Sequence, residues 1–593
     1  MKMKLVRAYL KKKSVGVFEN RTDDSGIIID GNYFKSTYMN SGCQFILGGE
    51  YDRYAAYLRK MLTSFTDIGV ELYVIFSGSM KADVDKRKEI HQKLMNKTDS
   101  IQPGRQENEY CEPTFTKDVQ REVFDELGIR YFVCEYNHSE ALISLAIDYN
   151  LPILTNNFEY CLFGVTCILP NSIVFDDNGF RCTVYKPNRQ LFPLSIDMMS
   201  ILLAISDEDS SYYQHIPGIL KCHEKLIFIS AQHWIRKQNK KSAIETLTKY
   251  LKPSDKQELL ETISYMEKLF KHSRHFVASS YRNRHAVQPT RIDTTSKDWF
   301  ETAVARGLIA IPYINLKNNN SCSGSWLIVE KNRDDAMLVA LDLIFYALGL
   351  LTNSTDLKIS FIGRQSSLSI VRDIEKKLPT RKALYMFRSS SDLCFAELFR
   401  VIINELMNGF DFVTLDSISK DCHMIIIALV YYSRKNKDFQ NGVYSILLSY
   451  FMLGPIGNKV GVLKKSNFAV THSTGDKTKD RYVTTANAFI DLFYSDRSRL
   501  KTIFNRNILH NIAEFEHCLQ HVNFLNKLCG EVTMCTIYHK AVNTRFVHNL
   551  YFTLRQEKNP LEYLKSRINC DSIYLEYENL IRVFEKCVHS VKE

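Results

Sequence analysis

The first third of the chain alternates between short apolar runs and amphipathic segments, and this alternation constrains the fold more than any other feature. Each apolar run ends at a polar or glycine-containing tip, and stretches with apolar residues three and four positions apart lie between the runs. Such an alternation of strands and helices favours a parallel sheet with right-handed crossovers. We therefore predict an α/β domain with a central parallel sheet flanked by helices. The expected strands are 27–29, 72–76, 130–134 and 152–155, and the expected helices are 52–66, 116–127 and 137–150.

Beyond about residue 196 the pattern becomes helical. Apolar residues recur at a period of three and four, which predicts a mostly α-helical second half. We expect an α/β domain at 1–215, a helical extension at 216–290 and a mainly helical C-terminal domain at 291–593, with the polar stretch 274–296 as the linker. The expected helices of this half include 336–351, 393–407, 424–432, 443–453 and 485–493.

Composition restricts the compartment and the partners. The 15 cysteines contain no Cys-x-x-Cys pair, so neither a zinc ribbon nor a disulfide framework is indicated. Residues 1–13 lack a long apolar core, and the apolar stretch 336–351 is short and contains Asp342. We expect an intracellular protein of the nucleus or cytoplasm with no membrane partner. The formal net charge of +11 suits a polyanionic partner such as nucleic acid.

Polar residues follow each predicted strand of the first domain. In an open parallel sheet, ligands bind beyond the carboxyl ends of the strands. Folding would gather the four tips onto one edge and so build one polar pocket from distant positions. The tips are Asp30-Gly31-Asn32, Ser77-Gly78, Asn137-His138-Ser139-Glu140 and Asn156-Asn157-Phe158-Glu159.

The order of these tips resembles that of flap endonucleases and XPG, which place acidic residues at the same points of a PIN-type nuclease fold. The asteroid family is similar and matches further segments, so the chain is identified as a divergent member of it, with the likeness strongest from Asp30 to Phe163. The segments that carry this resemblance are Gly48-Gly49-Glu50-Tyr51-Asp52, Arg121-Glu122-Val123-Phe124, Leu145-Ala146, Asn150-Leu151-Pro152-Ile153-Leu154, and Trp299 with Ala305-Arg306-Gly307.

The resemblance implies a site for two Mg²⁺ or Mn²⁺ ions, which several carboxylates must hold against their mutual repulsion. By position, the resemblance implies that Asp30, Glu159 and Asp207 are the catalytic acids. It implies weak metal ligands at Asp30, Glu159, Glu140, Asp207 and Glu208. Glu140 stands one place off register, about 100° around a helix. Neutral residues replace the other family acids, at Ser77, Asn137, Ser139 and Asn157.

Simpler interpretations exist for several of these residues. Asp30 before a glycine also fits an ordinary turn, as does Asn156-Asn157, and Glu159 is expected to be solvated if its neighbours are Asn157 and Ser77. The charged stretch 81–97 fits a solvated helix face better than an arch over substrate, and 215–219 only weakly resembles a helix–hairpin–helix turn. Candidate nucleic-acid-binding cations are Lys11, Lys12, Lys13, Arg236, Lys237, Lys240 and Lys241.

A separate pattern lies near the C-terminus. His517 and His521 have the i, i+4 spacing of helical zinc ligands, and His510 and Glu514 share their helix face. Histidines on a helix face are common, however, and the sequence lacks the His-Glu-x-x-His motif. We treat zinc as the minor alternative here.

Three functions remain open from the sequence. The favoured hypothesis is a nuclease-fold protein with a degenerate site, which binds single-stranded or branched DNA, or an unidentified protein partner, with little or no cleavage and no required cofactor. The second is an Mg²⁺- or Mn²⁺-dependent endonuclease for single-stranded or overhanging DNA, acting in DNA repair through a rearranged acidic site. The third is an interaction protein in signalling that binds no nucleic acid.

Overall fold

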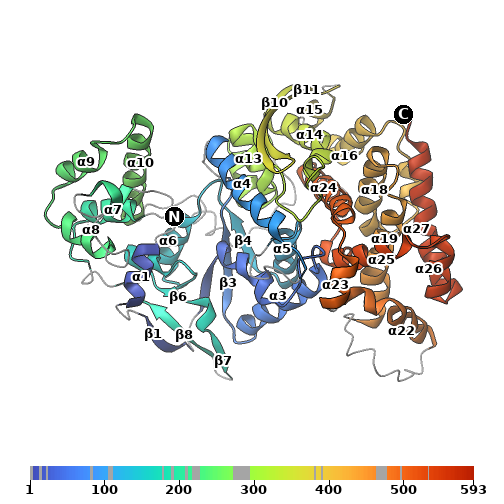
Figure 1. Ribbon diagram of the computed structural model, residues 1–593, viewed down its shortest axis with the longest axis horizontal. Helices are drawn as coiled ribbons and strands as arrows, with labels where there is room; N and C mark the ends of the chain where they lie inside the picture. Colours follow the sequence, from blue (N-terminus) through green and yellow to red (C-terminus); the bar gives the residue numbers. More distant parts are fainter. Residues whose placement is uncertain are drawn as a thin grey trace. The chain divides into compact units, whose positions relative to one another are not determined.

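Figure 1 shows the computed structural model of the chain. It describes residues 4–12, 16–21, 25–79, 84–103, 111–176, 179–187, 192–206, 212–216, 227–271, 294, 296–379, 382–388, 392–461, 477–494, 497–531 and 533–592. These residues form two compact units, and each unit is assembled from separate stretches of sequence. Unit 1 comprises 1–34, 61–77 and 128–287, and unit 2 comprises 35–60, 78–127 and 288–593.

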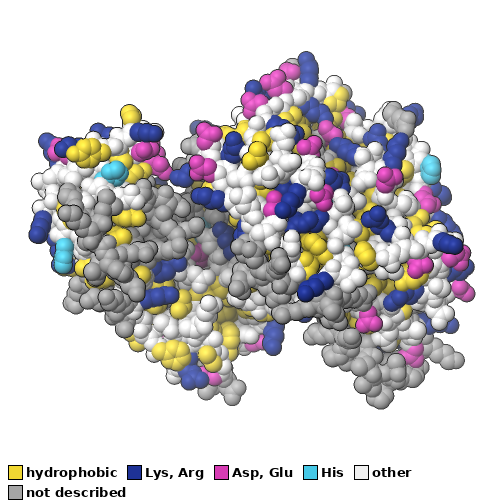
Figure 2. Space-filling view, viewed as in Figure 1, with side chains coloured by type: hydrophobic (Ala, Val, Ile, Leu, Met, Phe, Trp, Pro, Cys, Tyr) yellow, Lys and Arg dark blue, Asp and Glu magenta, His cyan; other side chains and the backbone are white. Residues whose placement is uncertain are grey.

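Basic side chains are spread over the surface. Lys and Arg side chains are scattered across the face seen in Figure 2, with Asp and Glu side chains among them. The positive net charge therefore does not by itself mark a binding surface on this face.

Unit 1 is built around a single twisted sheet with the strand order β1-β8-β6-β5-β2-β3-β4, and β7 pairs with β8. The five strands from β6 to β4 are mutually parallel, whereas β8 runs antiparallel to β6, β1 and β7. The strands are β1 (Val17–Arg21), β2 (Gly26–Asp30), β3 (Glu71–Phe76), β4 (Arg130–Val133), β5 (Ile153–Leu154), β6 (Cys167–Ile168), β7 (Val174–Asp176) and β8 (Gly179–Tyr185).

Helices surround this sheet and extend unit 1. The helix α6 packs against β2, and α7, α8, α9 and α10 gather into one helical group (Figure 1). Of these four, α8, α9 and α10 fall within residues 216–290. The helices that lie wholly in unit 1 are α1 (Lys4–Lys12), α6 (Ser139–Tyr149), α7 (Ile196–Ile205), α8 (Ile227–Ile235), α9 (Lys240–Thr248) and α10 (Pro253–Phe270), with 3₁₀ turns at Phe158–Phe163, Pro170–Ser172 and Tyr212–His215.

The predicted α/β architecture is confirmed. All four expected strands and the three expected helices exist, and α3 (Tyr51–Thr66), α5 (Thr116–Leu127) and α6 begin and end within two residues of the predicted bounds. The sequence did not predict β1, β6, β7 and β8. β6 has only two residues and β7 only three. All four strands lie at the end of the sheet where β8 pairs antiparallel with its neighbours.

Unit 2 is mostly helical, as expected. Its central helix α24 (Arg506–Leu528) is buried along most of its length and packs against α14, α18 and α25. The stretch 336–351 is a 3₁₀ turn followed by α14, and α14 is buried along nearly its whole length, which confirms the predicted buried helix. Among the described residues, no helix combines the length and apolar character that crossing a bilayer requires.

The further helices of unit 2 follow in chain order. They are α2 (Thr37–Asn40), α4 (Val84–Ser100), α12 (Trp299–Ala305), α13 (Ile311–Asn319), α14 (Leu341–Thr352), α15 (Lys382–Arg388), α16 (Asp392–Leu406), α17 (Phe412–Leu415), α18 (His423–Lys435), α19 (Gln440–Phe451), a π-helical turn (Met452–Ile456), α20 (Gly457–Val460), α22 (Lys477–Phe489), α23 (Arg497–Ile503), α25 (Thr544–Leu554), α26 (Pro560–Ile568) and α27 (Asp571–Ser590), with 3₁₀ turns at Gly31–Ser36, which begins in unit 1, and at Ala336–Ala340, Lys420–Cys422, Ile490–Phe493 and Tyr538–Lys540.

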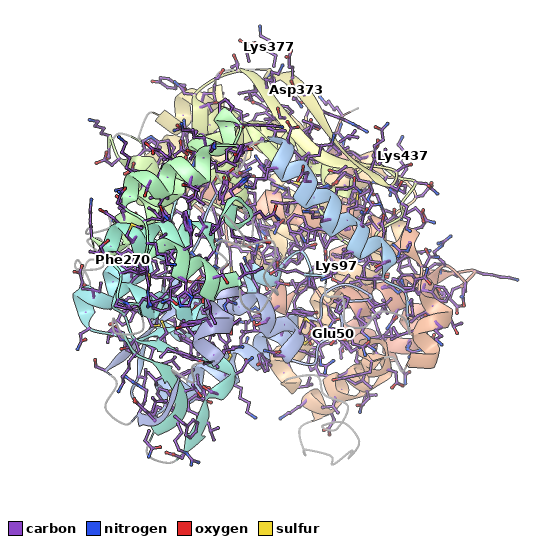
Figure 3. All side chains as sticks on the ribbon, turned by 60° about the vertical axis from the view of Figure 1, so that its left-hand side comes forward. Glu50, Lys97, Phe270, Asp373, Lys377 and Lys437 are labelled. Carbon is purple, nitrogen blue, oxygen red and sulfur yellow. The ribbon has the colours of Figure 1, made fainter. Side chains whose placement is uncertain are left out.

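A small sheet interrupts the helical unit. The strands β10 (Asp356–Gln365) and β11 (Leu368–Lys377) form a hairpin, and β9 (Ser321–Ser323) pairs in parallel with β10. Asp373 and Lys377 of β11 lie at the outer edge of this hairpin in Figure 3. The sequence did not predict the hairpin, because one face of β11 is solvent-exposed and its mixed charges resemble a solvated segment.

The segment 48–52, one of those that carry the family resemblance, is fixed to the C-terminal helices of unit 2. Glu50 is fully buried and forms an ion pair with Arg545 of α25, and it also pairs with Arg53 at 2.5 Å. Gly48 has φ of +92°, and a Cβ there would lie 2.2 Å from Thr544 Cγ2, so only glycine fits. The carbonyl of Gly49 accepts a hydrogen bond from the Thr544 amide at 2.8 Å.

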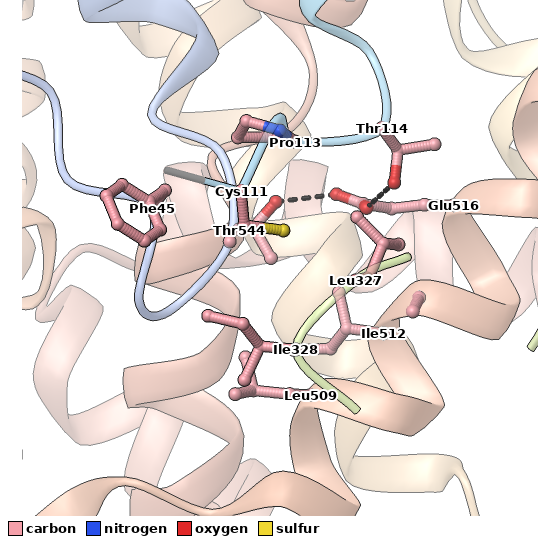
Figure 4. A pocket seen from close by; sticks show the side chains of 12 residues that line it. Phe45, Cys111, Pro113, Thr114, Leu327, Ile328, Leu509, Ile512, Glu516 and Thr544 are labelled. Atoms are coloured by element: carbon pink, nitrogen blue, oxygen red, sulfur yellow. Dashed lines mark hydrogen bonds between the residues drawn. The ribbon is translucent and has the colours of Figure 1, made fainter. Parts of the chain in front are cut away.

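A second buried carboxylate, Glu516, also joins the segment 48–52 to the C-terminal helices. Glu516 of α24 accepts hydrogen bonds from the hydroxyls of Thr114 and Thr544, each at 2.6 Å, and from Tyr51 at 3.2 Å. Figure 4 shows the two threonine hydrogen bonds beside a cavity of about 30 Å³. Burial raises the pKa of the Glu516 carboxyl, and the three hydroxyl donors only partly oppose this rise.

The division into units differs from the expected continuous domains. Residues 35–60 and 78–127, which the sequence placed in the domain 1–215, belong to unit 2, because buried polar contacts such as Glu50–Arg545 and Arg87–Ser321 join them to the C-terminal half. Most of the expected linker 274–296 lies outside the described residues.

The burial of the Glu50–Arg545 pair allows us to predict how a substitution changes the free energy of unfolding. Replacing Glu50 by Gln removes the carboxylate that neutralises a buried guanidinium, and we expect a loss of about 3–5 kcal/mol in the free energy of unfolding. Thermal unfolding followed by circular dichroism measures the change. Glu375→Gln serves as the control, because Glu375 is 72% exposed in its pair with Lys358, and it should shift stability by less than about 0.5 kcal/mol. Equal melting temperatures for the two variants would contradict the prediction.

Candidate functional site

The polar strand tips of unit 1 meet where the strand order reverses. From β2 the sheet continues to β3 and β4 on one side and to β5 and β6 on the other, so the carboxyl ends of β2 and β5 flank a topological switch point. Asp30 ends β2, and Thr155 and Asn157 follow β5. Open α/β sheets bind ligands at such a point. Polar residues of the first, third and fourth tips therefore come together at this point.

Asp30 is the centre of this site and is almost fully buried. Its Oδ1 lies 2.6 Å from His138 Nε2 and accepts the Asn32 amide at 2.9 Å, which is the turn contact that the simpler interpretation expected. Its Oδ2 accepts from Thr155 Oγ1 at 2.7 Å and from Asn157 Nδ2 at 3.3 Å. Burial opposes ionisation, but His138 and the hydrogen bonds outweigh it, so the pKa of the Asp30 carboxyl is lowered.

Glu159 is held by an arginine from the N-terminal helix. Arg7 of α1 donates from Nε to Glu159 Oε2 at 3.1 Å and from Nη2 to Oε1 at 2.8 Å, a two-pronged contact with a fully buried carboxylate. The same Nη2 also donates to Asn157 Oδ1 at 2.8 Å. The expectation that Glu159 is solvated is therefore wrong, because a cation from a distant part of the sequence neutralises its charge.

The third tip forms the start of α6. Asn137 Oδ1 accepts hydrogen bonds from the amide of Ser139 at 3.0 Å and from its hydroxyl at 2.9 Å, and that hydroxyl also lies 2.9 Å from Tyr160 Oη. Glu140 is paired with Lys268 of α10 at 2.8 Å. Two family acid positions thus bond to each other at the start of α6, and the off-register acid faces α10.

The structure describes only some of the remaining predicted site residues. Ser77 directly follows β3 and is half-buried. Asp207 and Glu208 lie outside the described residues. Within the part of the chain that the structure describes, no group of three or more His, Cys, Asp or Glu side chains is placed to hold a metal ion.

A pair of divalent ions does not fit this donor set. Two such ions at one site need several carboxylates that are free to ligate them. Here the carboxylates of Asp30, Glu159 and Glu140 each lie against a cationic or ionisable side chain of the same chain. The positions Ser77, Asn137, Ser139 and Asn157 contribute no charge.

Arg7 and His138 are two residues of the candidate site that the sequence did not single out. His138 stands inside the third tip, between Asn137 and Ser139, so its position alone could have indicated it. Its Nδ1 is buried and has no hydrogen-bond partner among the described residues. Arg7 precedes Glu159 by 152 positions, and no motif surrounds it.

The predicted nucleic-acid-binding cations have mixed positions in unit 1. Lys11, Arg236, Lys237 and Lys241 are exposed. Lys240 is paired with Glu267 at 2.5 Å and with Asp197 at 3.4 Å. The side chain of Lys12 and the whole of Lys13 lie outside the described residues, as do residues 217–219 of the expected helix–hairpin–helix turn.

The described part of the charged stretch 81–97 is not a plain solvated helix. Residues 84–97 belong to α4, whose buried side includes Arg87, His91 and Met95, while residues 81–83 lie outside the described part. The polar side chains of that face bind other residues of unit 2, because Arg87 and His91 have serine partners there.

The zinc hypothesis for α24 is not supported. His510 Nε2 lies 3.3 Å from Glu514 Oε1, but His517 and His521 are buried in the core of unit 2, and the described residues include no metal-binding cluster. Burial lowers the pKa of His517 to about 4 and that of His521 to about 3. The i, i+4 spacing therefore places two buried histidines on one helix face without a metal-binding cluster among the described residues.

The fold and the site define an α/β protein with a polar, charge-compensated pocket at the edge of a mostly parallel sheet. The family model of the Asteroid N-terminal domain matches residues 421–593. The resemblance to the asteroid family is thus confirmed over the C-terminal helices of unit 2, whereas the sequence analysis placed the strongest likeness at 30–163. No curated protein matches the chain.

Solved structures of nuclease cores are also similar to part of the chain. The catalytic core of Rad2 in complex with DNA substrate is 11% identical, with a TM-score of 0.28, and the match covers 44% of this chain and 79% of that one. Human GEN1 in complex with Holliday junction DNA is 12% identical, with a TM-score of 0.28, over 44% of this chain and 65% of that one. The fold class itself rests on the strand order and register of the sheet.

The lowered pKa of Asp30 allows us to predict how the stability of the protein depends on pH. A carboxyl whose pKa is lowered on folding stabilises the native state above its unfolded pKa of about 3.8, and this contribution is lost as pH falls through the lower folded value. Asp30→Asn should therefore cost about 1–3 kcal/mol at neutral pH, and the difference from the unmodified protein should shrink below about pH 4.

Urea unfolding at neutral and acidic pH measures this difference. Asp176→Asn is the control in unit 1, since Asp176 is exposed and lies 3.7 Å from Arg181. A difference for Asp30→Asn that stays constant or grows toward acidic pH would show that the carboxylate charge does not stabilise the fold.

Proposed function

We propose that this protein is a nuclease-fold protein that binds nucleic acid with little or no cleavage. The observation that supports this is the internal pairing of the remaining acids. Asp30 faces His138, Glu159 faces Arg7 and Glu140 faces Lys268, at 2.6–2.8 Å. Basic side chains of the chain itself thus contact the acids that a hydrolytic site would present to metal ions.

Metal binding would have to break these contacts. A divalent ion on Glu159 would compete with the two hydrogen bonds from Arg7, and a second ion beside Asp30 would lie against His138. Removing one partner of a buried ion pair costs about 3–5 kcal/mol, and that cost would weaken any metal site here. These contacts favour a nucleic-acid-binding role over that of an Mg²⁺- or Mn²⁺-dependent endonuclease.

The choice of nucleic acid as the ligand rests on charge. Lys11, Arg236, Lys237 and Lys241 of unit 1 are exposed, and the chain carries a net charge of +11. Phosphate contacts by such side chains supply affinity without a catalytic centre. Single-stranded or branched DNA is the ligand class that the family resemblance implies. A protein partner without nucleic acid becomes an outcome of the tests below.

A cleavage assay separates binding from hydrolysis. Labelled single-stranded and flap DNA are incubated with the purified chain in Mg²⁺ or Mn²⁺, beside the Asp30→Asn variant. We expect equal, background levels of product for both proteins. Cleavage that Asp30→Asn abolishes would overturn the proposal and establish the endonuclease.

The salt dependence of DNA binding tests the ligand. Affinity for single-stranded DNA should fall as salt rises, because each phosphate contact releases about 0.7 counterions. The triple variant Arg236→Gln, Lys237→Gln, Lys241→Gln should reduce the slope of log K against log salt by about 2. Lys240→Gln is the matched control with a smaller effect, because Lys240 is already paired with Glu267. Absence of DNA binding at low salt would favour a protein-interaction role instead.

A further inference from the structure

A cavity of about 330 Å³ lies within unit 2. Its walls come from α4, the segments 112–117 and 322–327, α13 and α24. Apolar side chains form much of the lining, among them Ile90, Pro113, Trp326, Leu327 and Met337. This size and character are typical of pockets for small organic molecules.

Arg87 of α4 is a buried cation in the wall of this cavity. It is 6% exposed, and its guanidinium donates to the hydroxyls of Ser321 and, at 3.2 Å, Ser323. Both partners are neutral, and the described part of the chain provides no ion pair to Arg87. Burial lowers the pKa of this side chain. Since a guanidinium has five N–H donors, some remain for an anion in the cavity.

His517 of α24 is a second unsatisfied group in the same wall. The residue is 6% exposed, and neither ring nitrogen has a hydrogen-bond partner among the described residues. Because burial lowers its pKa to about 4, the ring is neutral near pH 7 and offers one donor and one acceptor. Buried polar groups without partners are rare in native proteins, so this ring is available to a ligand in the cavity.

Other polar residues of the wall restrict the ligand further. Glu112 has a buried Oε1 without a hydrogen-bond partner, and its Oε2 lies 3.9 Å from Lys117. His91 contacts Ser369 at 2.9 Å, and its Nε2 lies 4.0 Å from Asp335. The carboxylate of Glu112 disfavours a second negative charge on the ligand and favours a hydrogen-bond donor.

We propose that this cavity binds a small aromatic acid: a planar, largely apolar molecule with one anionic group and a hydrogen-bond donor. Arg87 binds the anionic group, His517 hydrogen-bonds the edge of the ring system, and Trp326 with its apolar neighbours covers the ring. The site is independent of the proposed nucleic-acid function, since none of these residues lies at the sheet edge.

Calorimetric titration of the full chain with matched acid and neutral probes tests the proposal. The probes are 2-naphthoate with 2-naphthamide, and indole-3-acetate with indole-3-acetamide. At least one acid should bind at least tenfold more tightly than its amide. Arg87→Gln should remove that preference, whereas Arg372→Gln, which deletes an equal charge on β11, should preserve it. Failure of both acids to bind, equal binding of acids and amides, or full acid affinity in Arg87→Gln would overturn the proposal.

His517→Phe separates ligand binding from folding. Because neither nitrogen of His517 has a partner in the protein, this variant should melt at the same temperature or higher, while its affinity for the acid falls at least threefold. A lower melting temperature with unchanged affinity would mean that His517 supports the core and does not bind the ligand, which would also overturn the proposal.

Discussion

Much of this structure depends on the cost of taking a carboxylate out of water. An isolated buried charge costs several kcal/mol, so each buried acid needs a cation or several hydrogen-bond donors. Asp30, Glu159 and Glu50 are all within 1% of full burial, and they are matched by His138, Arg7 and Arg545. At the sheet edge, Asp30 and Glu159 thus have partners within the chain. In unit 2 it attaches an N-terminal loop to the last helices of the chain.

Most of the sheet could be predicted because its strands are short, fully buried runs with clear polar ends. The run Ile27-Ile28-Ile29 is an example, and it became β2 almost residue for residue. The two-residue strand β6 and the exposed strand β1 carry too little pattern to be recognised. At the site, Asp30 and Glu159 could be found because they follow strands. Arg7 could not, because its role depends on a helix that the fold brings from 152 positions away.

The segments that carry the family resemblance have a structural role in unit 2. Glu50, Tyr51 and Asp52 contact Arg545, Glu516 and Asn543. Glu122 accepts hydrogen bonds from the Tyr538 amide at 2.6 Å and lies 2.7 Å from His539 Nδ1. All of these partners fall within 421–593, where the Asteroid N-terminal domain model matches. Two motifs from the first quarter of the chain and the matched helices thus form one packed body, which sequence order alone does not reveal.

This arrangement has a consequence for how the protein is made. Glu50 and Arg545 are 495 positions apart, so at about 5–20 residues per second the ribosome needs roughly 25–100 s to supply the arginine after the glutamate. Throughout that interval Glu50 lacks its Arg545 partner, and Arg53 is the one of its two cations that is already present. Unit 2 can close only after Arg545 has been synthesised, so the two halves of this buried pair meet long after the loop is made.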